Sequence, residues 1–237
     1  MRSDAAAGFP ATGIKRQNMD KRDFDKEAAR WDEDPGRVKL ANDIADALIE
    51  EIRPSPGMDV LDFGCGTGLV TLRLAPLVRS VTGMDSSGGM LDVLGAKIAK
   101  YGVRNVQTLH LDPAPAGVPD GRYDLIVSSM TLHHVQEIDP LLDRFFDLLA
   151  PGGLLCVADL DLDEGRFHSD NAGVFHFGFD RDMLHATFLK VGFEDIRTRT
   201  AAEVVKPAKE GKTRIFTVFL MVGSKNGDRK GAKGEKS

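Results

Sequence analysis

The sequence predicts an α/β fold in which a doubly wound, mostly parallel sheet of seven strands is covered by helices on both faces. Short apolar runs of strand length alternate with segments of helical periodicity through most of the chain. Strands that are linked through helices form right-handed crossovers and pair in parallel. Two late apolar-rich runs, residues 193–205 and 213–224, are instead joined by a short charged loop (KPAKEGK), which predicts an antiparallel hairpin at the end of the domain.

Two helices are expected before the first strand. Phe24, Ala28 and Trp31 recur at spacings of four and three residues, as they do on one face of a helix. After an interruption at residues 34–36, a second apolar face runs as far as Pro54. The residues of this second face are Ala41, Ile44, Leu48 and Ile52.

The middle of the chain alternates between strands and helices. Strands are expected at residues 60–63, 80–84, 105–111, 123–128 and 153–160. Helices are expected at residues 69–77, 90–100, 138–150 and 181–191. Asp139 is expected to cap the helix that Pro151-Gly152 ends, and Asp180 and Gly192 are expected to bound the last helix.

A length of 237 residues fits one domain, which we expect between two disordered basic tails. Each tail, residues 1–22 and 225–237, carries a net charge of +3, so the rest of the chain is net −11. The patterned sequence begins only after Met19, which makes Met19 an alternative start to Met1. The expected parts of the domain are cap helices (23–56), a core that carries the binding loop described below (57–160), a lid segment (161–180), and a final helix with the hairpin (181–224).

Composition and charge exclude several classes of protein. The acidic body repels a phosphate backbone, so no specific nucleic-acid partner is expected. No apolar run approaches the roughly 18 residues that span a bilayer, and the first residues lack the apolar region of a signal peptide. Two cysteines cannot build a disulfide framework, which favours a cytoplasmic location. The oligomeric state is left open.

The most informative stretch is V-L-D-F-G-C-G-T-G, residues 60–68. A strand runs into a glycine-rich turn that opens a helix, which lets the backbone closely approach a ligand. Asp85 ends the next expected strand, so its carboxylate lies at the same sheet edge, where it can accept hydrogen bonds from a ribose. Together these features predict a site for a cofactor that contains a nucleoside.

The details of the turn favour one class of nucleoside cofactor. A dinucleotide site has the spacing G-x-G-x-x-G, whereas here a single residue separates the second and third glycines. Asp62, just before the turn, would repel a pyrophosphate and attract a positively charged ligand. S-adenosylmethionine carries an ammonium and a sulfonium and has no phosphate, so we expect it as the cofactor.

Residues 62–68 resemble motif I of the class I S-adenosylmethionine-dependent methyltransferases, in particular the group that includes ubiquinone, menaquinone and other small-molecule methyltransferases. Four later segments resemble further elements of that family, in the same order: Met84-Asp85, Leu111-Asp112-Pro113, residues 123–127, and the L-x-P-G-G turn at residues 149–153. The resemblance covers about residues 58–160, and it implies a Rossmann-like fold and methyl transfer to a small or medium acceptor.

The resemblance also implies roles for single residues on the cofactor side. The glycine turn would pass under the methionine portion, Asp62 would position its amino group, and Asp85 would bind the ribose hydroxyls. Ser86 and Met90 would flank the adenine, Asp112 would accept from its amino group, and Ser128 would approach the methionine tail. The expected cofactor-binding residues are Asp62, Gly64, Cys65, Gly66, Gly68, Asp85, Ser86, Met90, Asp112, Pro113 and Ser128.

The acceptor side is less specified, because displacement at a sulfonium needs no protonated leaving group and no obligatory base. His133, after the fourth strand, is our candidate for a base or an orienting residue. Candidate pocket residues are Phe24, Trp31, His134, His168 and His176. No metal site is expected, because the histidines lack the usual ligand spacing. After the fourth strand the chain has S-S-M-T instead of the N/D-P-P-Y/F motif of enzymes that methylate nucleobase amines or glutamine amides, so those acceptors are not expected.

Two other functions stay open. A non-catalytic module that binds S-adenosylmethionine and acts with a partner would have the same cofactor residues. A nicotinamide-dependent oxidoreductase would share the sheet, although the glycine spacing and Asp62 disfavour it.

Overall fold

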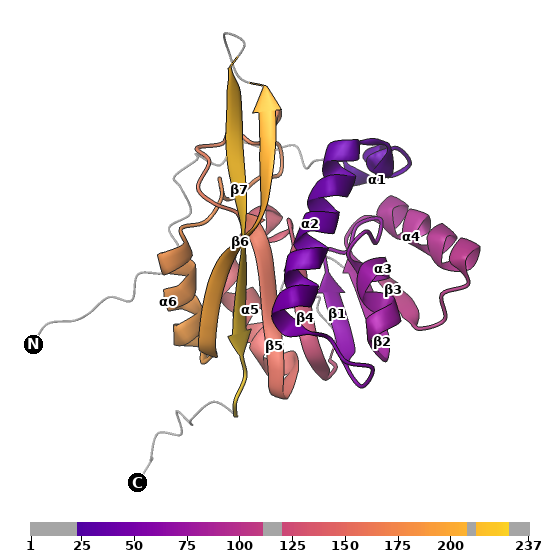
Figure 1. Ribbon diagram of the computed structural model, residues 1–237, viewed down its shortest axis with the longest axis vertical. Coiled ribbons are helices and arrows are strands. Elements are labelled where there is room, and N and C mark those ends of the chain that lie inside the picture. Colours follow the sequence, from indigo (N-terminus) through magenta and orange to yellow (C-terminus); the bar gives the residue numbers. More distant parts are fainter. Residues whose placement is uncertain (1–22, 111–119, 208–211, 228–237) are drawn as a thin grey trace, which may run out of the picture.

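The computed structural model describes residues 23–110, 120–207 and 212–227. They form a seven-stranded sheet in the order β3-β2-β1-β4-β5-β7-β6 (Figure 1). The first five strands pair in parallel, and β7 is antiparallel to both β5 and β6. The strands are β1 (Asp59–Phe63), β2 (Ser80–Asp85), β3 (Val106–His110), β4 (Tyr123–Ser129), β5 (Leu149–Leu160), β6 (Glu194–Pro207) and β7 (Thr213–Ser224). The predicted sheet and its terminal hairpin are confirmed.

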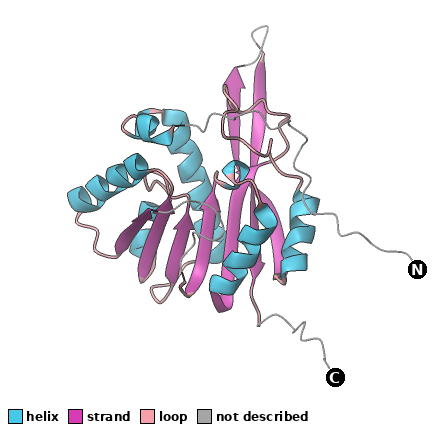
Figure 2. Cartoon of the chain, turned by 180° about the vertical axis from the view of Figure 1, so that it is seen from behind, coloured by secondary structure: helices cyan, strands magenta, loops and turns pink. Residues whose placement is uncertain are grey.

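Helices cover both faces of the sheet (Figures 1 and 2). The α-helices are α1 (Phe24–Ala28), α2 (Pro35–Ile52), α3 (Thr71–Leu74), α4 (Gly88–Tyr101), α5 (Ile138–Leu148) and α6 (Arg181–Val191). Short 3₁₀ turns occur at η1 (Trp31–Glu33), η2 (Ala75–Leu77) and η4 (Leu132–His134).

The alternation of residues along β1 explains the two layers of core. Leu61 packs in a buried cluster with α5 and α6, whereas its neighbour Val60 packs in a second cluster with α2 and α3. Successive side chains of a strand point to opposite faces, so a strand with no polar face must be covered on both sides. The apolar runs of the sequence therefore fix a sheet between two helical layers.

Helix boundaries follow capping chemistry at α6 but not at α5. The Asp180 side chain accepts from the backbone N–H groups of the first turn of α6, and Gly192 ends that helix with φ +115°, as expected. At α5 the residue before the helix is Glu137, which makes no side-chain cap, and Asp139 pairs with Lys190 at 3.0 Å. The expectation that Asp139 caps α5 is wrong.

Strand β5 also begins earlier than the sequence indicated. Leu149 pairs with Tyr123 of β4, so the strand starts before the Pro-Gly pair that was expected to separate it from the helix. Backbone pairing with β4 begins at this residue, and α5 ends at Leu148.

Lys225 corrects the boundary of the carboxyl-terminal tail. Only 3% of its surface is exposed, and its Nζ donates to the carbonyl oxygens of Phe146 and Leu149, at 2.8 and 2.9 Å. Phe146 lies in the last turn of α5 and Leu149 is the residue that caps it, so both carbonyls are at the carboxyl end of the helix, where a cation is favourable. Lys225 therefore belongs to the folded domain, while residues 1–22 and 228–237 lie outside the described residues.

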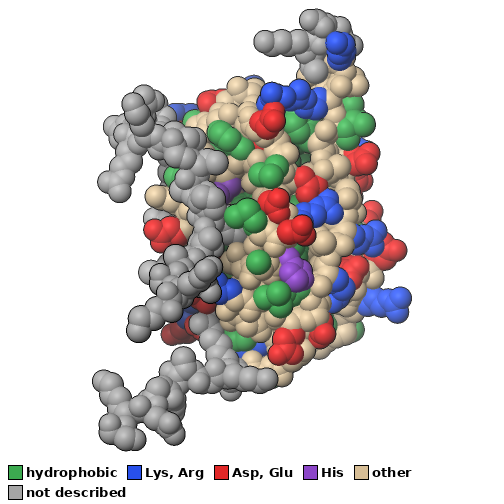
Figure 3. All heavy atoms as spheres, turned by 90° about the vertical axis from the view of Figure 1, so that its left-hand side faces the viewer, with side chains coloured by type: hydrophobic (Ala, Val, Ile, Leu, Met, Phe, Trp, Pro, Cys, Tyr) green, Lys and Arg blue, Asp and Glu red, His purple; other side chains and the backbone are tan. Residues whose placement is uncertain are grey.

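The surface on the α6 side carries acidic and basic side chains side by side, with hydrophobic side chains between them, wherever undescribed residues do not cover it (Figure 3). In the part of the chain that the structure describes, no helix combines the length and the apolar character that a membrane span requires.

Candidate active site

The glycine-rich loop after β1 is fixed to the end of β2 by backbone hydrogen bonds. The N–H groups of Gly64 and Cys65 both donate to the carbonyl of Met84, at 2.8 and 3.0 Å. The N–H of Gly66 donates to Asp85 Oδ2 at 2.8 Å, and the N–H of Ser87 donates to Oδ1 at 2.9 Å. Loop and carboxylate are thus held together at the carboxyl edge of the sheet, where ligands of doubly wound folds bind.

Two glycines of this loop have different reasons to be glycine. A Cβ at Gly64 would overlap the Thr131 side chain, so that position is required by internal packing. A Cβ at Gly66 would meet no atom within 4 Å, although its φ of +53° is rarely adopted by other residues. Gly66 therefore exposes its backbone to open space, as a loop that passes beneath a ligand must.

Two buried carboxyl groups lie beside the loop. Burial raises the pKa of Asp62 to about 6, against the hydrogen bond that it accepts from Thr71 Oγ1 at 2.5 Å, and the charge of Asp85 raises it further. Burial also raises the pKa of Asp85, although the N–H groups of Ser87 and Gly66 oppose the shift. A ligand with positive charge would relieve the cost of ionising both groups, because an opposite charge stabilises a desolvated carboxylate.

The amino-terminal helices are tied to the same loop by two aspartates that the sequence analysis did not single out. Asp25 Oδ1 accepts from Ser87 Oγ at 2.6 Å and from the N–H of Gly89 at 2.8 Å, which joins α1 to the start of α4. Asp32 accepts from Thr67 Oγ1 at 2.6 Å and pairs with Lys97. These contacts hold α1 and η1 over the loop (Figure 1).

A cavity of about 690 Å³ connects the glycine loop with a group of histidines. Its volume lies within the range of about 300–1,000 Å³ that is usual for small-molecule sites. At the loop end the lining includes Asp62, Gly64, Cys65, Gly66, Asp85, Ser86 and Met90. At the other end it includes Phe24, Trp31, His133, His134 and His168.

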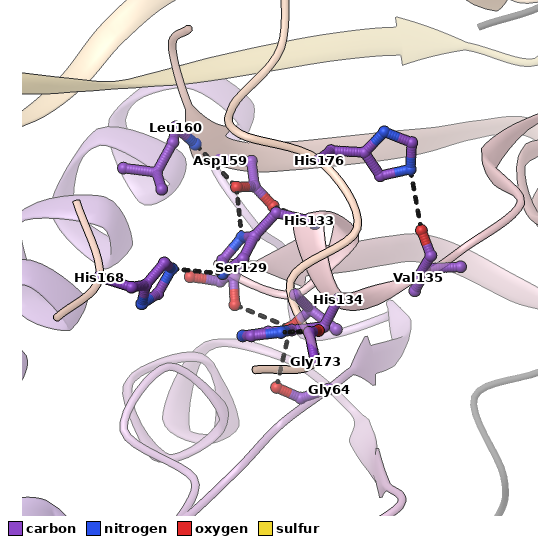
Figure 4. Close-up of polar contacts among 11 residues, drawn as sticks. Gly64, Ser129, His133, His134, Val135, Asp159, Leu160, His168, Gly173 and His176 are labelled. Atoms are coloured by element: carbon purple, nitrogen blue, oxygen red, sulfur yellow. Dashed lines mark hydrogen bonds and ion pairs between the residues drawn. The ribbon is translucent and has the colours of Figure 1, made fainter. Parts of the chain in front are cut away.

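The histidine end is built around a buried pair. His133 Nδ1 lies 2.7 Å from Asp159 Oδ1, and both side chains are at most 1% exposed (Figure 4). Burial alone would raise the pKa of Asp159, but the facing His133 and the N–H groups of Leu160 and His133 outweigh it, so the pKa lies below its ordinary value. The carboxylate can only accept, so His133 carries its proton on Nδ1.

Two further histidines meet this pair. His168, from the segment after β5, places its Nε2 3.2 Å from His133 Nε2 (Figure 4). His134 Nδ1 lies 2.7 Å from the carbonyl oxygen of Gly173. The Phe24 ring of α1 packs edge-on against His134 at 5.2 Å between centroids, so the amino-terminal helix also closes this end.

Comparison with known proteins finds methyltransferases among the matches by sequence and among the matches by fold. A family model described as a methyltransferase domain matches residues 60–153, from β1 into β5. An uncharacterised methyltransferase of Schizosaccharomyces pombe is 31% identical over 163 residues, which cover 63% of this chain and 57% of the relative. A ubiquinone biosynthesis O-methyltransferase of a Chelativorans species is 32% identical over 110 residues, 46% of this chain and 43% of the relative.

The fold agrees with these matches. The phosphoethanolamine N-methyltransferase 2 of Haemonchus contortus, solved with S-adenosyl-L-methionine, superposes with a TM-score of 0.64 at 15% identity, over 86% of this chain and 60% of that one. Residues 60–153 therefore match a methyltransferase domain, and the chain has the fold of solved S-adenosylmethionine-dependent methyltransferases. It spans little more than half the length of the first curated relatives that it matches, 57–58%.

Most of the predicted site residues line the cavity, and three of those that the structure describes do not. Gly68 lies outside the lining, where a Cβ would collide with Leu94. Ser128 is fully buried and Ser129 lines the cavity in its place, because neighbouring strand residues point to opposite faces. His176 is also absent from the lining, and its Nε2 lies 3.0 Å from the carbonyl oxygen of Val135. Asp112 and Pro113 lie outside the described residues.

Burial raises the pKa of the Cys65 thiol well above its ordinary value, and the charges of Asp62 and Asp85 raise it further, so the thiol stays neutral and fills space in the loop.

Asp159 was missed by the sequence analysis. It stands near the carboxyl end of a buried strand, as Asp85 does, and the same rule would have found it.

Proposed function

We propose that this methyltransferase transfers a methyl group from S-adenosylmethionine to a small or medium acceptor by in-line displacement. One observation carries the proposal: a single cavity of about 690 Å³ joins the acidic glycine-loop end to the histidine end. The two ends thus provide separate places for a cofactor and an acceptor in one cavity.

The cofactor end suits the chemistry of S-adenosylmethionine. Asp62 is our candidate for the partner of the methionine ammonium, and Asp85, already held by two backbone N–H groups, keeps lone pairs for the ribose hydroxyls. Met90 and Ser86 line the cavity next to Asp85 and would flank the adenine. The backbone at Gly66 leaves room for the ligand directly above the loop.

When bound, S-adenosylmethionine supplies an electrophilic methyl group whose bond to sulfur breaks as the bond to the acceptor forms. The residues of the chain then have to orient the acceptor, exclude water and, for an acceptor that carries a proton, assist its loss. Phe24 and Trp31 enclose the cavity from the amino-terminal side. His133, fixed by Asp159, would orient or deprotonate the receiving atom.

Calorimetric titration with S-adenosylhomocysteine, with NAD⁺ in parallel, tests the cofactor. Micromolar binding of S-adenosylhomocysteine alone supports the proposal, whereas binding of NAD⁺ alone would favour an oxidoreductase and overturn it. A screen of small acceptors with S-adenosylmethionine, read out as S-adenosylhomocysteine formed, then tests transfer. Tight cofactor binding without turnover on any acceptor would favour a non-catalytic module.

The role of His133 has a separate test on whichever acceptor is found. The His133→Ala variant should keep its affinity for S-adenosylhomocysteine and lose about 100-fold or more in turnover, the usual contribution of a positioned acid or base. Equal losses in affinity and turnover would place His133 in the cofactor site instead.

A cytoplasmic location stays a prediction from the cysteine count.

A further inference from the structure

The three histidines at the acceptor end gather more closely than side chains that only line a cavity need to. Among the described residues, one ring nitrogen from each of His133, His134 and His168 lies within 4.8 Å of the other two. They come from η4 and from the segment after β5, so the fold brings them together from separate parts of the chain (Figure 4). We propose that these three histidines bind a divalent transition-metal ion of the zinc type.

The separation of two of the nitrogens fits shared coordination. His133 Nε2 and His168 Nε2 are 3.2 Å apart. Tetrahedral zinc holds imidazole nitrogens at about 2.0–2.1 Å, which places two such ligands about 3.3 Å from each other. A metal ion between them needs almost no movement of these two rings, and binding would draw the His134 ring inward to complete the set.

The hydrogen-bond partners of two rings favour the tautomer that a metal requires. Asp159 and the Gly173 carbonyl can only accept, so His133 and His134 carry their protons on Nδ1 and have their lone pairs on Nε2. Metal-binding histidines commonly donate the other ring N–H to a carboxylate or a backbone carbonyl, which fixes the ring and strengthens the ligand. Here both kinds of partner are present.

The type of ligand narrows the choice of ion. Three imidazoles suit Zn²⁺, Co²⁺, Ni²⁺ or Cu²⁺, whereas Mg²⁺ and Ca²⁺ prefer oxygen ligands. Three protein ligands also leave a fourth coordination position, as in catalytic zinc sites. All three histidines line the cavity, so that position would face its interior. If the proposed methyl transfer holds, an oxygen, nitrogen or sulfur atom of the acceptor would occupy it, and the ion would lower the pKa of that atom. His133, with its Nε2 on the ion, would then orient the acceptor through the ion instead of acting as its base.

A hydrogen bond between two neutral rings is the competing explanation, with His168 Nε2–H donating to His133 Nε2 at the same distance. The two explanations differ in what they predict for added metal. A hydrogen-bonded pair needs no ion and gives no specific uptake, whereas a metal site binds one ion per chain.

The test is calorimetric titration of tag-free, chelator-treated protein with ZnCl₂, together with the visible absorption of added Co²⁺. We expect one Zn²⁺ per chain at micromolar or tighter affinity and the intense Co²⁺ bands of a tetrahedral site. His168→Ala and His134→Ala, both at half-buried positions, should each weaken Zn²⁺ binding at least tenfold and abolish those bands. Asp159→Asn should weaken it about 10–100-fold, as loss of a ligand's hydrogen-bond partner does.

His185→Ala on α6 is the matched control, because it removes a histidine that is not part of the cluster. It should leave Zn²⁺ affinity unchanged. Absence of Zn²⁺ binding, or equal affinity in wild type and His168→Ala, would overturn the metal site. S-adenosylhomocysteine is titrated into the same samples. If S-adenosylhomocysteine binds and Zn²⁺ does not, only the metal site fails. If Zn²⁺ binds and S-adenosylhomocysteine does not, only the proposed function fails.

Discussion

The two ends of the cavity are held together by different kinds of contact. At the loop end, neighbouring segments of the chain meet at the edge of the sheet, and backbone N–H groups of Gly66 and Ser87 set the position of Asp85. At the histidine end, side chains from separate parts of the chain contact one another directly. His133 meets Asp159 and His168, which lie 26 and 35 residues further along the chain.

This difference has a physical consequence for each end. A site made by backbone geometry depends on glycine conformation and strand register, so most side-chain changes around it are tolerated. A site made by buried side chains depends on each partner, because removing one leaves the other unsatisfied in a low dielectric. Thr131 links the two, since its Oγ1 lies 3.3 Å from the Gly64 carbonyl while its chain neighbours form η4.

The largest expected effect is on stability, from breaking the buried pair at the histidine end. Asp159→Ala should lower the free energy of unfolding by about 3–5 kcal/mol, because it leaves three buried N–H groups, two of His133 and one of Leu160, without their acceptor. Urea unfolding measures the change. Asp139→Ala, which removes a partly exposed carboxylate paired with Lys190, is the control and should cost at most about 1 kcal/mol. Similar losses of unfolding free energy in both variants would mean that burial of the His133–Asp159 pair adds nothing to stability.

The next largest effect is on cofactor binding at the loop end, and it leaves the histidine end unchanged. Gly66→Val should weaken S-adenosylhomocysteine at least 100-fold, about 2.7 kcal/mol, because the new side chain occupies the open space above the loop. Gly102→Val is matched in strain: Gly102 ends α4 with φ +64° and also has open space around its Cβ position. Calorimetry on both variants separates strain from ligand contact. Binding that survives in Gly66→Val would mean that the ligand does not cross this loop.

The same contrast explains what the sequence could predict. The alternation of strands and helices, the hairpin, the caps of α6 and the cavity position of Asp62, Gly66 and Asp85 all follow from local patterns, because contiguous segments and strand ends determine them. The partners of His133 do not follow from such patterns. Residues 161–180 have no repeating period, so nothing local indicates that His168 returns to His133 or that Gly173 meets His134. The start of β5 was missed for a similar reason, since pairing with β4 decides it.

A smaller effect sharpens the assignment of the loop end. Asp85→Ala should weaken S-adenosylmethionine by about 1–3 kcal/mol, the cost of leaving ribose hydroxyls without their acceptor. The carboxylate also accepts from Gly66 and Ser87, so the variant is checked for an unchanged thermal midpoint. Asp92→Ala, an exposed carboxylate on α4, is the control and should bind normally. Equal calorimetric affinities in both variants would remove Asp85 from the cofactor site.

The smallest expected effect concerns the charge of Asp62. Burial raises its pKa to about 6, so the carboxyl group of the unliganded protein is mostly protonated at pH 5 and mostly ionised at pH 7.5. An ammonium binds better to the ionised form, so affinity for S-adenosylhomocysteine should be full above the raised pKa and be lost as the pH falls through it. At pH 5 the loss should reach about tenfold, since one pKa unit corresponds to about 1.4 kcal/mol.

Two controls attribute this pH dependence of binding to Asp62. Asp62→Asn should bind S-adenosylhomocysteine with no change in affinity between pH 5 and pH 7.5, because its amide keeps an oxygen for Thr71 but does not titrate. Adenosine lacks the ammonium, so its affinity for the wild-type protein should also be flat over this range. If adenosine binding changed equally with pH, the role of Asp62 would be contradicted. The titrating group would then be on the ribose side of the site. There Asp85, whose pKa burial also raises, would be the group that loses its charge.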